Sequence, residues 1–129
     1  MNNGDMRPVA GALAEPPAFA IATESMGTTK VIAVQGELDL LTVPDLRAAL
    51  VAATAANADA VVLDLLGVSF IDSVSLAAIV RAKRDLGTKR LAVVIAPDSY
   101  VTLIFEIGGM DSIVELVGTR EEALARLST

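Results

Sequence analysis

Apolar and polar residues alternate near the start of the chain in a pattern typical of β-strands. Phe19, Ile21 and Thr23 alternate with Ala or Glu, which predicts a first strand. A second strand is predicted at residues 30–35, whose centre is β-branched, and residues 26–29 link the two. Because so short a link joins antiparallel neighbours, we expect an N-terminal β-hairpin.

Along the rest of the chain, segments whose apolar residues recur at helical spacing alternate with short continuous apolar runs. One helical pattern begins at Pro44, which suits the first position of a helix, and stops near Asn57. Strands that alternate with helices indicate parallel pairing, so the sequence predicts an α/β fold: a single domain with a mixed, mostly parallel β-sheet, the N-terminal antiparallel hairpin and about four α-helices. The further predicted elements are strands at residues 60–65 and 91–95, a short strand within residues 111–116, and helices at residues 76–86, 101–107 and 119–127.

The helix predicted at residues 101–107 is apolar around much of its circumference. Two interpretations are open. Either this helix is deeply buried, or part of its surface is a docking face for a partner.

Composition sets the domain boundaries and the expected compartment. The 129 residues fit one domain, and a content of 53% hydrophobic residues is enough for a sizeable core. Residues 1–17 are rich in Gly, Pro and Ala and show no period, so we expect a flexible tail, followed by the domain at residues 18–129. No apolar run is long enough to cross a bilayer or to resemble a signal peptide, which predicts a cytoplasmic protein without membrane insertion.

Several kinds of chemistry are excluded by the residues that the chain lacks. It has no Cys and no His, so disulfides, thiolate catalysis, Ser–His catalysis and Cys/His metal sites are ruled out. We therefore expect no enzyme, no cofactor and no metal. A hard cation held by carboxylates stays open as an alternative, although the chain has no loop motif for one. The net charge of −6 argues against nucleic acid, and the densest basic group, within residues 81–90, is interpreted as the solvated end of a helix.

Polar residues stand where two predicted strands end. Asp39 follows the second strand, and Ser69 to Ser75 follow the third. Because the carboxyl ends of parallel strands share one edge of a sheet, these two loops should be adjacent. Asp72, Ser73 and Ser75 also begin a helix, where they suit either an anion site or ordinary N-capping, and capping is the better explanation of Ser75. Asp39 equally suits a turn held by local hydrogen bonds.

The order of the motifs resembles the STAS domain, in particular its bacterial anti-sigma factor antagonists. The resemblance runs from Phe19 to Leu127. It rests on residues 36–39 (Gly-Glu-Leu-Asp), 42–47 (Thr-Val-Pro-Asp-Leu-Arg), 70–73 (Phe-Ile-Asp-Ser) and 105–110 (Phe-Glu-Ile-Gly-Gly-Met). It implies the STAS fold and a protein-binding role in which Asp39 and Asp72 help to bind a partner anti-sigma factor of the serine-kinase type.

The chain departs from the family at the start of the helix. The family string is Asp-Ser-Ser-Gly-Leu, and the resemblance is taken to place the phosphoacceptor at its second serine. Val74 stands there, and Ser75 replaces the glycine. Two outcomes follow: constant partner binding set by protein level, or phosphorylation at Ser73 or Ser75. Constant binding is favoured, because a kinase positions one hydroxyl and a neighbouring one is misplaced.

Two classes of function therefore remain. The first is an anti-sigma factor antagonist that binds its partner through Asp39, Asp72, Ser73, Val74 and Ser75 and so releases a sigma factor. The second is a STAS module outside sigma regulation, which binds a small ligand or serves a transporter or a lipid-trafficking complex. The sequence leaves a homo-oligomer open.

Overall fold

The structure is a computed structural model that describes residues 18–128, so the tail expected at residues 1–17 lies outside the described residues. The described chain forms five strands, four α-helices and one short 3₁₀ helix. In chain order these are β2 (Ala20–Met26), β3 (Thr29–Leu38), α2 (Val43–Ala55), β4 (Ala60–Ile71), α3 (Ser73–Leu86), β5 (Arg90–Val94), α4 (Tyr100–Ile107), η1 (Met110–Ser112), β6 (Glu115–Val117) and α5 (Arg120–Leu127).

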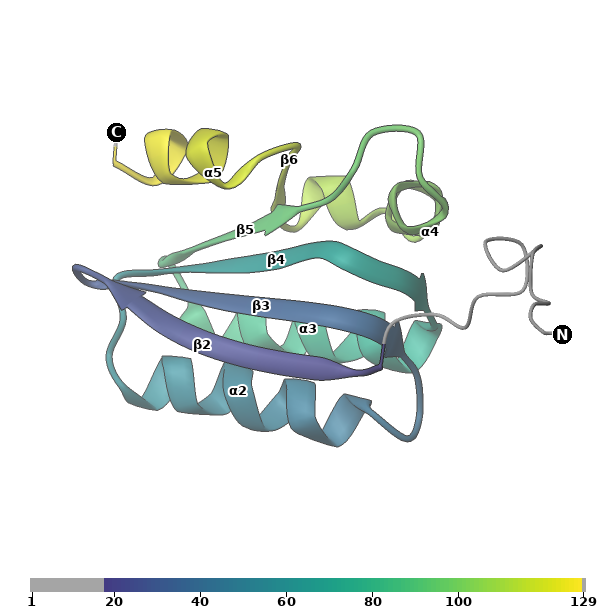
Figure 1. Ribbon diagram of the computed structural model, residues 1–129. Helices are drawn as coiled ribbons and strands as arrows, with labels where there is room; N and C mark the ends of the chain where they lie inside the picture. The colour runs from purple at the N-terminus through teal and green to yellow at the C-terminus, as the bar shows by residue number, and fades with distance from the viewer. Residues whose placement is uncertain (1–17, 129) are drawn as a thin grey trace, which may run out of the picture.

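The five strands form one sheet in the order β2-β3-β4-β5-β6. β2 pairs with β3 antiparallel, and the other three pairs of neighbours are parallel. The predicted α/β fold, with its mixed sheet, N-terminal hairpin and four helices, is confirmed (Figure 1).

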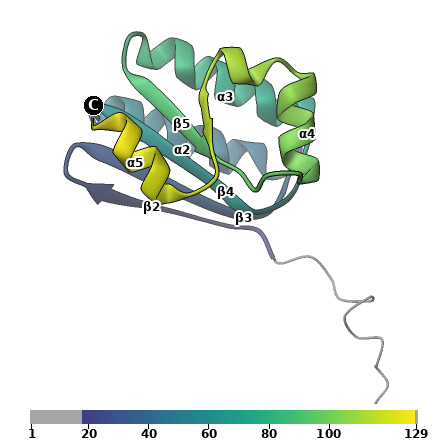
Figure 2. The same cartoon turned by 90° about the horizontal axis from the view of Figure 1, so that it is seen from above.

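Helices cover both faces of the sheet. α2 and α3 lie side by side on one face, while α5 crosses the other face and α4 lies near the end of β4 (Figures 1 and 2). The larger core lies under α2 and α3, and Val101 and Phe105 of α4 also belong to it. A smaller core lies under α5 and is made of Val31, Val62, Ala92, Val94, Val117 and Ala123.

Two strands are longer than predicted. β3 extends to Leu38 and β4 to Ile71, so Ser69 lies within β4 and not in the loop after it. The strands continue past two irregularities in their pairing, and the Asp64 side chain accepts a hydrogen bond from the Leu66 N–H there (3.0 Å). A Cβ at Gly67 would lie 2.9 Å from the Cβ of Gln35, so the close approach of the strands requires glycine.

Most predicted helix ends agree with the structure. Asn57 follows the end of α2 with φ 60°, and Gly87 ends α3 with φ 63°. The side chains of Ser99 and Thr119 are the N-caps of α4 and α5. The fifth strand occupies the end of its predicted segment and one residue beyond it, because η1 forms first.

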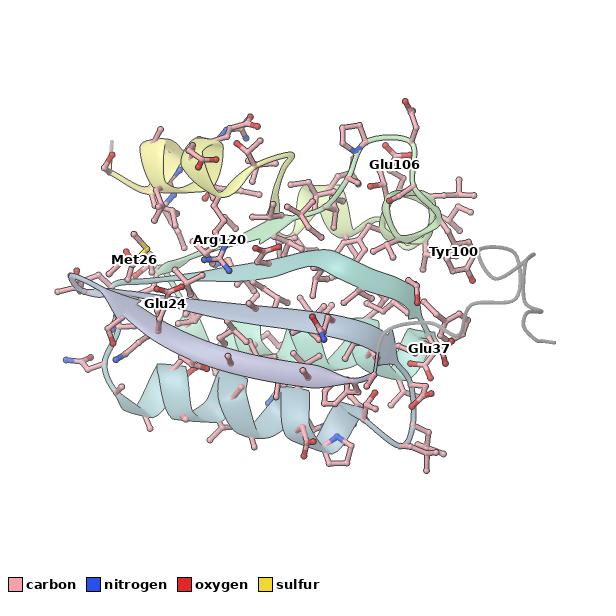
Figure 3. The ribbon with its side chains drawn as sticks, in the orientation of Figure 1. Glu24, Met26, Glu37, Tyr100, Glu106 and Arg120 are labelled. Carbon is pink, nitrogen blue, oxygen red and sulfur yellow. The ribbon has the colours of Figure 1, made fainter. Side chains whose placement is uncertain are left out.

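Ion pairs fasten α5 to the sheet. The Arg120 guanidinium contacts the carboxylates of Asp64 (2.6 Å) and Glu24 (3.0 Å) from β4 and β2 (Figure 3). The hydrogen bond to Asp64 is the main cause that raises the pKa of Arg120.

Candidate functional site

The loops after β3 and β4 lie beside each other, as predicted. Leu38 pairs with Ile71 at the ends of the two strands, and the Asp72 N–H donates to the Leu38 carbonyl oxygen (3.2 Å). Asp39 and Asp72 therefore begin neighbouring loops at the end of the sheet where β3 and β4 stop. We call these two loops the carboxyl edge.

Asp39 holds its own loop in place. Its Oδ1 accepts hydrogen bonds from the N–H groups of Leu41 (3.0 Å) and Thr42 (3.2 Å), and its carbonyl oxygen accepts one from the N–H of Val43 (2.8 Å). The Thr42 hydroxyl donates to the carbonyl oxygen of Glu37 (2.8 Å) and makes no side-chain cap for α2. The turn interpretation of Asp39 is therefore confirmed, and this turn sets the shape that a partner would meet.

Asp72 is the N-cap of α3. Its Oδ1 accepts hydrogen bonds from both the N–H and the hydroxyl of Ser75, each at 2.9 Å. The expectation that Ser75 caps the helix is wrong. Ser75 lies in the first turn of α3, and its hydroxyl donates a hydrogen bond to the capping carboxylate of Asp72. Because one carboxylate oxygen takes both bonds, Oδ2 of Asp72 has no partner among residues 18–128.

The three residues after Asp72 differ sharply in exposure. Ser73 is exposed, Val74 is half-buried and packs against the larger core, and Ser75 is fully buried. Of the two candidate phosphoacceptors, only Ser73 presents its hydroxyl to solvent, at the positive end of the α3 dipole. A side chain at position 74 faces the core more than the solvent.

Sequence reasoning missed the apolar part of this edge. Leu40 and Leu41 have relative exposures of 70% and 88%, although they lie between Asp39 and the start of α2. Two adjacent leucines within a turn cannot both point into a core, and this was the available signal. The carboxyl edge thus joins carboxylates, one free hydroxyl and exposed leucines, which suits protein recognition better than catalysis.

Metal binding and membrane crossing find no support in the described chain. Among residues 18–128, no group of three acidic side chains is placed to hold a metal ion. No helix of this part of the chain is long and apolar enough to cross a bilayer.

Comparison with known proteins agrees with this architecture. The family model of the STAS domain matches residues 20–123. The anti-sigma-F factor antagonist RsfB of Mycobacterium tuberculosis is 27% identical over 112 residues, which cover 87% of this chain and 92% of that protein.

Solved structures lead to the same family. An anti-sigma factor antagonist from Mycobacterium paratuberculosis superposes with a TM-score of 0.82 at 28% identity, covering 89% of this chain and 98% of that chain. The Bacillus protein SpoIIAA, solved in unphosphorylated and phosphorylated forms, matches at 25% identity over 84% of this chain, with TM-scores of 0.66 and 0.62 and coverage of 98% and 99% of those chains. Since the family model spans most of the described domain and the fold agrees, this chain belongs to the STAS domain family.

Proposed function

We propose that this protein is an anti-sigma factor antagonist, which binds an anti-sigma factor and so releases a sigma factor for transcription. The observation that carries this proposal is similarity over nearly the whole domain to proteins named for that activity. The carboxyl edge supports it, because exposed leucines beside carboxylates form a surface suited to a protein partner.

The partner in this proposal is an anti-sigma factor of the serine-kinase type. It contacts the Asp39 loop, the segment from Asp72 to Val74 and the exposed side of the first turns of α3. Ser75, which the sequence also assigned to the partner surface, is fully buried and supports Asp72 instead. Such a kinase needs a hydroxyl that it can approach, and Ser73 supplies one next to the N-cap. SpoIIAA, a relative in fold and sequence, exists in a phosphorylated form, which supports a covalent switch of this kind.

The sequence favoured constant binding, but the exposed hydroxyl of Ser73 leads us to propose a switch, with Ser73 and not position 74 as the phosphoacceptor. Ser75 is fully buried and already donates its hydroxyl to Asp72. A phosphate on Ser73 carries about −1.5 to −2 charges at neutral pH and lies at the positive end of the helix dipole. In a complex with a kinase it also faces the remaining nucleotide diphosphate, so like charges repel and the complex weakens.

Calorimetric titration with the anti-sigma factor tests the partner and the interface. Asp39→Ala and Asp72→Ala should weaken binding more than Glu121→Ala and Arg126→Ala, which alter α5. Equal affinity for all four variants would contradict the interface. No binding of the wild-type protein to any kinase-type anti-sigma factor from its source cell would contradict the function itself.

Intact-mass measurement after incubation with the same kinase and ATP tests the switch. The wild type and Ser75→Ala should each gain one phosphate, and Ser73→Ala should gain none. Because Val74→Ser adds a half-buried hydroxyl, it should not restore phosphorylation to Ser73→Ala. An unmodified wild type would contradict phosphorylation at Ser73 and favour constant binding set by protein level.

A further inference from the structure

One side of α4 exposes apolar residues that the core does not use. Val101 and Phe105 are buried, whereas Tyr100, Leu103 and Ile107 have relative exposures of 49%, 51% and 73%. The three exposed residues are spaced by three and four positions, so they share one side of the helix. The sequence left two interpretations of this helix, deep burial or a docking face. The structure shows that one side of α4 is buried and that the other exposes apolar side chains.

Phe70 extends this stripe onto the sheet. Its ring stacks on that of Tyr100, with centroids 6.0 Å apart and an angle of 13° between the planes, and Phe70 is itself 37% exposed. Phe70 pairs with Glu37 in the residue step just before Leu38 and Ile71, which end their strands. The α4 patch, which we define as Phe70, Tyr100, Leu103 and Ile107, thus begins directly beside the carboxyl edge.

Acidic side chains surround the α4 patch, and basic ones are absent from its segment. Glu37, Asp98 and Glu106 are exposed, and none of the three forms an ion pair within residues 18–128. Asp98, Tyr100, Leu103 and Glu106 line one shallow surface hollow. Residues 91–119 contain neither Lys nor Arg. Figure 3 shows Glu37 and Tyr100 at the same end of the molecule, with Glu106 on α4.

This charge selects the occupant of the patch. A second copy would bring the same carboxylates against these, and an anionic lipid surface or a nucleic acid would be repelled. An apolar protein segment flanked by Lys or Arg satisfies both the exposed rings and the unpaired carboxylates.

We infer that the α4 patch is a second docking surface for the anti-sigma factor, which presents to it an apolar segment flanked by Lys or Arg. This inference rests on the proposed function, because it names a further contact with the same partner. In this arrangement the carboxyl edge contacts the active site of the kinase. The α4 patch adds a contact area that begins at Phe70 and continues along α4.

Site-directed cross-linking maps the contact directly, since the chain has no cysteine of its own. Leu103→Cys, labelled with a benzophenone maleimide, should cross-link on irradiation to a segment of the anti-sigma factor that contains Lys or Arg. Met26→Cys is the matched control, because Met26 is 45% exposed in the hairpin far from α4, and it should not cross-link. Cross-linking at Met26 alone, or to a segment without basic residues, would overturn the inference.

Affinity measurements separate this inference from the proposed function. Leu103→Ser combined with Ile107→Ser should weaken the complex at least tenfold, and Glu106→Lys should also weaken it. Val51→Ser, at a residue 61% exposed on α2, should bind like the wild type, and thermal unfolding verifies that each variant is folded. If the wild type binds and the double variant binds equally well, the α4 patch is not a docking surface. If the wild type does not bind, the proposed function fails and this inference fails with it.

Discussion

Within residues 18–128, the arginines around α5 form ion pairs with carboxylates, whereas Asp39 and Asp72 at the carboxyl edge form none. Arg120 joins Asp64 and Glu24, and Arg90 forms a two-point contact with Glu115 (2.6 and 2.7 Å). At the end of the sheet where β3 and β4 stop (Figure 1), the ion pairs within residues 18–128 include neither Asp39 nor Asp72. The difference separates charges that hold the fold together from charges that remain available to a partner.

Exposed apolar residues follow the same division. Leu40, Leu41 and the α4 patch lie at or beside the carboxyl edge, where Glu37, Asp98 and Glu106 form no ion pair within residues 18–128. Near α5, the residues of the smaller core are buried, and Asp64 and Glu24 are paired with Arg120. The comparison predicts that stability and binding respond to different substitutions.

The largest effect on stability is expected at Arg120. Arg120→Met leaves the Asp64 carboxylate, whose side chain is 12% exposed, without its partner, and should lower the free energy of unfolding by about 2 kcal/mol. Urea unfolding measures this loss. The exposed pair Arg81–Asp85 is the control, and Arg81→Ala should cost less than about 0.5 kcal/mol. The comparison would fail if Arg120→Met weakened partner binding while leaving stability unchanged.

A smaller loss is expected at Asp72, where cap and charge can be separated. Asp72→Ala removes the cap of α3 and leaves the buried Ser75 hydroxyl without its acceptor, at a cost of about 1–2 kcal/mol. Asp72→Asn keeps a capping oxygen and should stay close to wild-type stability, yet bind the anti-sigma factor more weakly. Asn and Asp binding with equal affinity would show that the carboxylate charge does not contribute to recognition.

Acid should lower the stability of the fold through the Arg90–Glu115 pair. The hydrogen bond from Arg90 holds the pKa of Glu115 below its ordinary value, so the bond from β5 to β6 stabilises the fold at neutral pH. Its contribution is complete above the ordinary glutamate pKa and is lost as the pH falls through the lowered one. The thermal unfolding temperature of Glu115→Gln should therefore fall less steeply with decreasing pH than that of the wild type, once the pH is below the ordinary glutamate pKa. Parallel declines for both proteins would contradict this assignment.

The smallest change in stability is expected at the exposed leucines. Leu40→Ser combined with Leu41→Ser should leave the free energy of unfolding within about 0.5 kcal/mol of the wild type, because neither side chain is buried. Calorimetry should nevertheless show weaker binding to the anti-sigma factor. A marked loss of stability in this variant would show that the two leucines belong to the core and not to the binding surface.

Sequence periodicity predicted the elements and the adjacency of Asp39 and Asp72, because parallel strands end at a common edge. It could not separate Ser73 from Ser75, since their exposure depends on the phase at which α3 begins after its cap. It also ended β4 too early, because the apolar run is interrupted at Gly67, where the pairing with β3 is irregular. Contacts such as Arg120 with Asp64, 56 positions apart, arise only from the folded sheet.

Exposure of the leucines was only partly within reach of sequence reasoning, because their adjacency in a predicted turn shows that one of them faces solvent but not that both do. In the sequence, Leu40 and Leu41 look no different from leucines of the core. The turn held by Asp39 directs their side chains into solvent. The α4 residues show the same difficulty, because Leu103 and Phe105 are both apolar and only one of them is buried.

Amide hydrogen exchange of the free protein and of its complex with the anti-sigma factor shows which surface binds the partner. Complex formation should protect backbone amides at residues 39–42, 70–76 and 100–107, which form the carboxyl edge and the α4 patch. It should leave residues 81–90 and 120–127 unchanged. Protection confined to α5 or to the end of α3, with none at the carboxyl edge, would contradict the account.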